Sequence, residues 1–96
     1  MISKLLVTFS AVPDVLEEKI AMQECVDSMY EAGCSGHVLE ETKRLVARLR
    51  AEGWKEDDIR ESANAALEAC VEKYKDHPQH QLRLGDVGQC IAELVP

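Results

Sequence analysis

Aromatic side chains are scarce in this chain, since only Phe9, Tyr30, Trp54 and Tyr74 occur among its 96 residues. Hydrophobic residues nevertheless make up 46% of the chain, which excludes a sequence too polar to fold. The interior must therefore consist mainly of aliphatic side chains, alanine, methionine and cysteine. Such interiors suit closely packed helices better than sheets, which favour aromatic and β-branched residues.

Long apolar runs and an excess of basic residues are also missing. No stretch approaches the roughly 20 apolar residues that cross a membrane as a helix. The N-terminal residues resemble a secretory signal only superficially, because they have one lysine and no Ala-x-Ala site before Pro13. We therefore expect a cytoplasmic protein with reduced cysteines. The net charge of −7 disfavours direct binding to nucleic acid or to an anionic membrane.

Signatures of catalysis and of cofactor binding are absent as well. The segment Gly85-Asp86-Val87-Gly88 has no strand before it and no lysine at the position that would contact a phosphate. The acidic residues fall on expected helix exteriors, where no burial would raise their pKa for acid–base chemistry. We expect no enzymatic activity and no cofactor.

The four cysteines, which are Cys25, Cys34, Cys70 and Cys90, form no Cys-x-x-Cys pair. Three of them fall on apolar helix faces, where a free thiol behaves as a small hydrophobic group. Cys34, beside a turn and near a helix start, is the one plausible thiol nucleophile, but nothing resembles an oxyanion hole. As an alternative, an oxidising compartment would favour a disulfide between Cys25 and Cys70 across two packed helices.

Two short pairs have the spacing of metal ligands, namely Cys34-x-x-His37 and His77-x-x-His80. Such spacings let one turn supply two of the four ligands of zinc. This combination is not a common structural zinc pattern, and an apolar bundle does not need a metal to fold. Cys34, His37, His77 and His80 are therefore weak candidates, and two polar turns are the preferred interpretation.

Apolar spacing predicts a series of helices. Residues 2–12 suit a helix or a strand, and Pro13 is expected to end this element because Val12 is pushed out of the α region. Further helices are expected over residues 14–32, 37–52 and 56–75, where apolar residues recur every three or four positions. A last short helix is expected over residues 86–94. The prediction is an all-α fold, a small single-domain bundle (residues 1–96) of three main helices plus short terminal elements.

The segment 14–32 concentrates negative charge, with six acidic residues against Lys19 alone. A period of 3.6 residues places the apolar side chains, such as Met22 and Val26, on one side of the helix. The opposite side presents an acidic stripe of Glu17, Glu24, Asp27 and Glu31. Exposed helices usually mix charges of both signs, so the stripe indicates a binding face for a basic partner. The acidic start of the third helix, with Glu56, Asp57 and Asp58, is expected to extend it.

We therefore expect a non-catalytic interaction module that docks on a basic, nucleic-acid-binding surface of a partner protein and occludes it. A row of carboxylates imitates a phosphate backbone, and a charge of −7 would speed the encounter and make it sensitive to salt. Small phage-encoded inhibitors such as anti-CRISPR proteins are an example of this class, which size and charge alone indicate.

Two alternatives remain open. In a small helix-turn-helix regulator, the helices 37–52 and 56–75 would form the motif, and Lys43, Arg44, Arg48 and Arg50 would cluster on one exposed surface. In a structural homodimer, Met22, Met29 and the alanines of the third main helix would lie at a symmetric interface.

Overall fold

The computed structural model describes the backbone of residues 2–96 and the side chains of residues 15–96. This part of the chain forms four helices, and no strand occurs in it. The prediction of an all-α fold is confirmed. The helices are α1 (Ile2–Ala32), α2 (Gly36–Ala51), α3 (Glu56–Lys73) and α4 (His80–Leu94).

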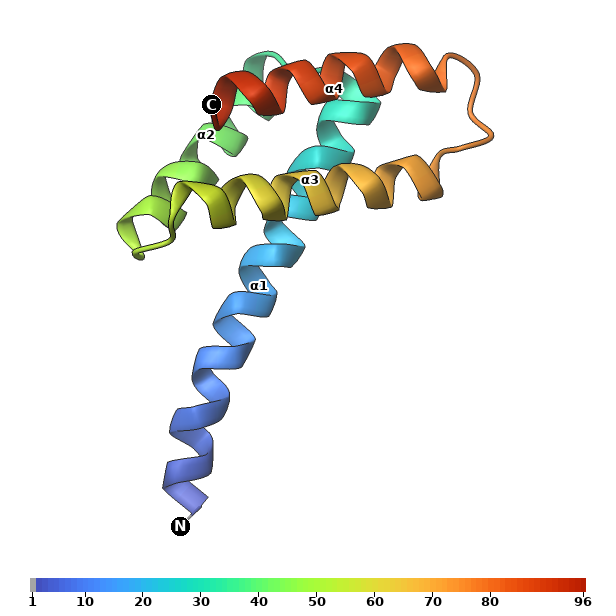
Figure 1. Cartoon of the computed structure of the whole chain (residues 1–96). Coiled ribbons are helices and arrows are strands. Elements are labelled where there is room, and N and C mark those ends of the chain that lie inside the picture. The colour runs from blue at the N-terminus through green and yellow to red at the C-terminus, as the bar shows by residue number, and fades with distance from the viewer. Residues whose placement is uncertain (1) are drawn as a thin grey trace.

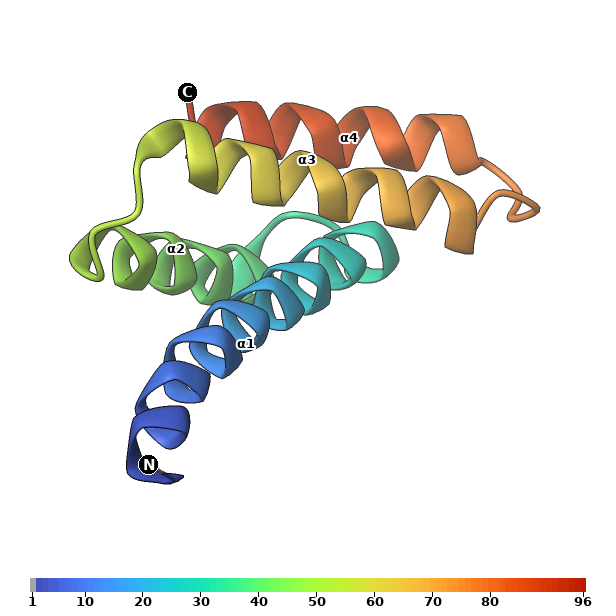
Figure 2. The same ribbon diagram turned by 60° about the horizontal axis from the view of Figure 1, so that its bottom comes forward.

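Helices α3 and α4 run side by side in opposite directions, and α1 crosses beneath them next to α2 (Figures 1 and 2). Only the C-terminal half of α1 belongs to the bundle. Its N-terminal half projects away from the other helices. A helix of this length reaches roughly 46 Å at about 1.5 Å per residue, and the molecule is accordingly elongated, with extents of 53 × 26 × 23 Å.

All four helices contribute to one aliphatic core, as the shortage of aromatic residues predicted. Met22, Val26 and Met29 of α1 are buried at the i, i+4, i+7 spacing of a helix face. Leu49 of α2 and Ile59 of α3 are fully buried beside them. The other buried hydrophobic residues are Tyr30, Leu45, Val46, Ala63, Ala66, Cys70, Val87, Cys90, Ile91 and Val95.

The expected count of three main helices is corrected to four, because both terminal elements differ from the prediction. Helix α1 continues through Pro13. A proline inside a helix removes one hydrogen bond and crowds the preceding turn, but it can kink a helix without ending it. Helix α4 begins at His80, six residues before the expected start at Asp86.

Tertiary contacts explain the early start of α4. The imidazole of His80 is buried, and a hydrogen bond of 2.8 Å joins its Nδ1 to Tyr30 Oη. The guanidinium of Arg83 lies over the Tyr30 ring, 5.6 Å from its centroid. These contacts fix the first turn of α4 against α1, and no local pattern in the sequence predicts them.

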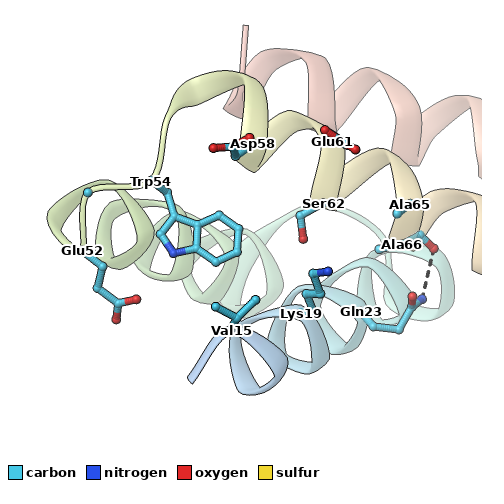
Figure 3. A pocket seen from close by; sticks show the side chains of 11 residues that line it. Val15, Lys19, Gln23, Glu52, Trp54, Asp58, Glu61, Ser62, Ala65 and Ala66 are labelled. Atoms are coloured by element: carbon cyan, nitrogen blue, oxygen red, sulfur yellow. Dashed lines mark hydrogen bonds between the residues drawn. The ribbon is translucent and has the colours of Figure 1, made fainter. Parts of the chain in front are cut away.

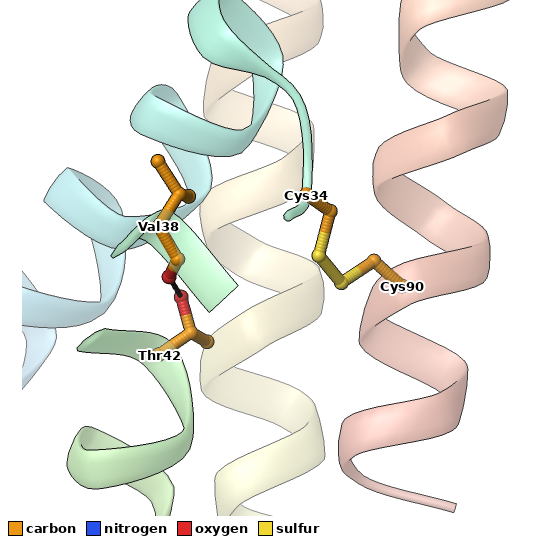
Figure 4. The surroundings of a disulfide bond; sticks show 4 residues. All are labelled: Cys34, Val38, Thr42 and Cys90. Atoms are coloured by element: carbon orange, nitrogen blue, oxygen red, sulfur yellow. Dashed lines mark hydrogen bonds between the residues drawn. A yellow bond between two sulfur atoms is a disulfide. The ribbon is translucent and has the colours of Figure 1, made fainter. Parts of the chain in front are cut away.

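A disulfide joins Cys34, in the loop after α1, to Cys90 of α4 (Figure 4). Cys25 and Cys70 are free. The alternative pairing of Cys25 with Cys70 is therefore wrong, and the expectation of reduced cysteines fails for Cys34 and Cys90. The spacing of the sequence could not reveal the pairing, because the two half-cystines are 56 residues apart and meet only when α4 folds back over the bundle.

Among the described residues, no helix combines the length and the apolar character needed to cross a membrane.

Candidate interaction surfaces

Glu17, Glu24 and Glu31 are exposed on α1 and define what we call the acidic face. Each is seven residues from the next, about 10 Å along the helix. None of the ion pairs between described side chains involves them. No basic group among the side chains of residues 15–96 therefore balances their charges at close range.

Two large apolar side chains lie next to the acidic face. Leu16 and Ile20 are 56% and 51% exposed. Ile20 follows Glu17 by three residues and precedes Glu24 by four, so these side chains are neighbours on the helix surface. The sequence reasoning missed this apolar component, although the i, i+4 spacing of Leu16 and Ile20 was a signal for it.

Asp27, the fourth residue of the predicted stripe, lies apart from the acidic face in a contact between α1 and α3. It accepts hydrogen bonds from Cys70 Sγ (2.8 Å), Gln23 Nε2 (2.9 Å) and Lys73 Nζ (3.2 Å). Burial raises the pKa of Asp27, but these three hydrogen bonds outweigh it and hold the pKa below its ordinary value. Its charge is thus used within the fold.

The same contact makes Cys70 unreactive. Burial, together with its hydrogen bond to Asp27, raises the pKa of the Cys70 thiol to about 12. A thiol must ionise to act as a nucleophile or as a metal ligand. Cys70 therefore remains a protonated donor in the contact between the two helices.

The acidic start of α3 is divided between pairing and exposure. Arg50 donates two hydrogen bonds to the Glu56 carboxylate, at 2.9 and 2.8 Å, and they hold the pKa of Glu56 below its ordinary value. Asp57 pairs with Arg60 at 2.8 Å. Asp58 has no ion pair with a described side chain and lines a groove. The structure does not bring these residues together with the acidic face.

The groove lies between α1, the α2–α3 corner and α3, and has a volume of about 610 Å³ (Figure 3). Val15, Lys19 and Gln23 border it from α1, one helical turn apart. This side of α1 lies about 140° around the helix from the acidic face, at about 100° per residue. The remaining lining residues are Glu52, Gly53, Trp54, Asp58, Glu61, Ser62, Ala65 and Ala66.

The end of α2 places Trp54 in this groove. Gly53 has a φ of +94°, a left-handed conformation that suits glycine at a helix C-terminus. The N–H of Trp54 then donates to the carbonyl of Leu49 at 3.0 Å, the six-to-one bond of a Schellman motif. The only tryptophan of the chain is thereby held half-buried beside Val15 and Asp58. Glycine followed by tryptophan at a helix end was a sequence signal for this anchor.

The weak metal candidates are not assembled into a site. Cys34 is in the disulfide, His37 and His77 are exposed, and His80 is buried against Tyr30. Among the described residues, no group of three or more histidine, cysteine or acidic side chains is arranged to hold a metal ion.

The basic residues of α2 are largely engaged in ion pairs. Arg44 pairs with Glu41 at 2.9 Å. Arg48 donates two hydrogen bonds, at 3.1 and 2.7 Å, to the buried carboxylate of Glu18 on α1. Arg50 pairs with Glu56, as described above. Only Lys43 of the four residues expected on a DNA-binding surface has no ion pair among the described side chains.

The residues of the predicted dimer interface lie mostly inside the core. Met22 and Met29 are each 2% exposed. Ala63 and Ala66 of α3 are also buried, whereas Ala65 and Ala69 are exposed. A symmetric contact through both methionines would require the bundle to open.

Compared with protein-family models, with curated proteins and with solved structures, the chain gives no match.

Proposed function

We propose that this protein is a non-catalytic interaction module that docks on a basic surface of a partner protein and occludes it. The supporting observation is the acidic face itself: Glu17, Glu24 and Glu31 are exposed in one row on a helix and have no ion pair with a described side chain. The row has the negative sign that a nucleic-acid-binding surface attracts, as in small phage-encoded inhibitors.

The apolar neighbours strengthen this proposal. Exposed carboxylates alone give speed and salt sensitivity of association but little affinity. Leu16 and Ile20, each about half exposed beside the acidic face, offer the apolar contact from which a stable interface gains its affinity. The partner surface should therefore combine lysine or arginine with an apolar centre.

The ion pairs of α2 make the helix-turn-helix alternative weaker than the proposed docking on a basic protein. Arg44, Arg48 and Arg50 would have to leave carboxylate partners to reach phosphates. Of these two kinds of partner, we therefore rank a basic protein above DNA.

The test uses a charge-reversed variant, Glu17→Lys/Glu24→Lys/Glu31→Lys. Pull-downs from lysate at about 0.05 and 0.5 M salt, which differ strongly in screening, identify proteins bound at low salt. The purified partner is then titrated by calorimetry with and without its nucleic acid. We expect the variant to bind about tenfold more weakly or worse, since 1.4 kcal/mol corresponds to a factor of ten, and nucleic acid to compete with the wild-type protein.

A matched control has the same net charge but leaves the acidic face intact. Glu40, Glu68 and Glu93 are exposed and have no ion pair with a described side chain, so Glu40→Lys/Glu68→Lys/Glu93→Lys changes the total charge equally. Both variants should retain the far-UV circular dichroism of the wild type. Equal binding losses in the two variants would reduce the effect to net charge and refute a specific acidic face.

A further inference from the structure

The groove beside Trp54 is a second surface of the bundle, separate from the acidic face. From the geometry and charge of this groove, we infer that it binds a short cationic, amphipathic segment of a partner protein. The shape of the groove, the apolar side chains along it and the charges around it support this assignment.

The groove has the length of a short peptide segment. Along α1 it extends from Val15 to Gln23, and along α3 from Asp58 to Ala66, which is about 12 Å on each side at 1.5 Å per residue. This length matches two turns of a helix. The volume of about 610 Å³ is comparable to that of pockets that bind small molecules, about 300–1,000 Å³.

Apolar side chains along the groove include an aromatic anchor. Trp54 lies with its ring between Val15 and Asp58 (Figure 3), and Ala65 and Ala66 line the groove along α3. No hydrogen bond between described residues uses the indole N–H of Trp54. A half-buried tryptophan, with one apolar ring and one polar N–H, is typical of an interface.

The rim selects for positive charge. Glu52, Asp58 and Glu61 stand around the groove against a single base, Lys19. Asp58 and Glu61 have no ion pair with a described side chain, and Glu52 has only a 4.0 Å contact to Arg48. An occupant with lysine or arginine next to an apolar residue would contact these carboxylates. Its cationic group would also contact the ring of Trp54, which attracts cations.

The chain supplies its own reporter for the test, because Trp54 is its only tryptophan. The probes are a Trp-free amphipathic peptide of leucine and lysine and a matched peptide of leucine and glutamate, each titrated while Trp54 emission is recorded. We expect a saturable change of emission with the lysine peptide and none with the glutamate peptide. Similar changes with both peptides would overturn the inference of charge selection.

Two variants of groove residues should change the affinity for the lysine peptide in opposite directions. Asp58→Asn/Glu61→Gln should weaken the lysine peptide by about fivefold, since two exposed charge contacts are worth about 1 kcal/mol together. Lys19→Gln removes the lone base and should strengthen binding about twofold or more, a result that damage to the fold would not produce. Unchanged affinity in both variants would overturn the proposal.

A control variant separates this surface from the proposed function. Glu17→Gln/Glu24→Gln removes two charges from the acidic face, which lies about 140° around α1 from the groove. It should leave the Trp54 titration within about twofold of the wild type. An equal loss of affinity with this control and with Asp58→Asn/Glu61→Gln would show that peptide binding depends only on total charge. That result would refute the groove as a site, whether or not the acidic face binds a partner.

Discussion

Asp27 shows how a residue expected at the surface becomes part of the structure. Its carboxylate accepts hydrogen bonds from a thiol, an amide and an ammonium group, donated by Cys70, Gln23 and Lys73. Helical spacing placed Asp27 at the edge of the acidic stripe, only about 40° around the helix from Glu31 at about 100° per residue. That difference is enough to turn it toward α3 and away from a partner.

We predict that Asp27→Ala lowers the free energy of unfolding by about 1–3 kcal/mol, because the buried thiol of Cys70 and the half-buried amide of Gln23 lose an acceptor. The measurement is urea unfolding followed by circular dichroism. Glu24→Ala, on the exposed part of the same helix, is the control and should change stability by less than about 0.5 kcal/mol.

The pH dependence of this difference gives an independent check. The pKa of Asp27 is lower in the folded protein than its ordinary value, so its stabilisation is fully present above the unfolded-state pKa. It disappears as the pH falls through the folded-state pKa. The gap between wild type and Asp27→Ala should therefore narrow below about pH 4, and a gap that widens in acid would contradict this account.

At the scale of elements, local signals predicted the two central helices well and the terminal ones poorly. Apolar periodicity with glycine at a helix end located α2 and α3 to within about two residues. Pro13 was given too much weight as a terminator, and the start of α4 depends on a contact of His80 with Tyr30, fifty residues away. Such contacts, like the Glu18–Arg48 pair, leave no trace in local spacing.

The candidate site divides in the same way. Exposure of Glu17, Glu24 and Glu31 followed from the helical period, because the opposite side of α1 is buried. The pairing of Glu56 with Arg50 and of Asp27 with Lys73 required the relative placement of helices. The groove at Trp54 required the same knowledge, since three separate segments line it.

The turn between α2 and α3 supplies a prediction at this scale. Gly53→Ala forces a side chain into a left-handed conformation, with φ at +94°, and should destabilise the protein by roughly 1–2 kcal/mol. Trp54 emission should shift to longer wavelength, because the anchor is held by the same turn.

The matched control for the turn is Gly85→Ala. Gly85 lies inside α4 with open space around its Cβ position, so alanine there should stabilise the protein by about 0.5–1 kcal/mol. Thermal unfolding of both variants measures the two effects. Equal changes of stability at Gly53 and Gly85 would show that the left-handed turn is not what constrains residue 53.

At the scale of the whole molecule, binding surfaces and scaffold are separate. The acidic face and the groove lie on different sides of α1, whereas the core, the disulfide and the Glu18–Arg48 pair hold α1 against the other helices. A rigid frame keeps exposed charges in a fixed row, and this preorganisation reduces the entropy that a partner must remove on binding. Loosening the frame should therefore weaken association even when no surface residue changes.

The disulfide tests this link between frame and surface. Cys34–Cys90 closes a loop of 56 residues, for which the chain-entropy model gives an upper value of about 4 kcal/mol. We expect Cys34→Ser/Cys90→Ser, or reduction of the wild-type protein, to lower the free energy of unfolding by about 2–4 kcal/mol in guanidinium titrations. Reductant should leave the stability of the double variant unchanged, and identical midpoints for oxidised and reduced wild type would refute a stabilising bond.

The reduced protein should also bind the partner of the acidic face more weakly, because α4 and the end of α1 are then no longer joined.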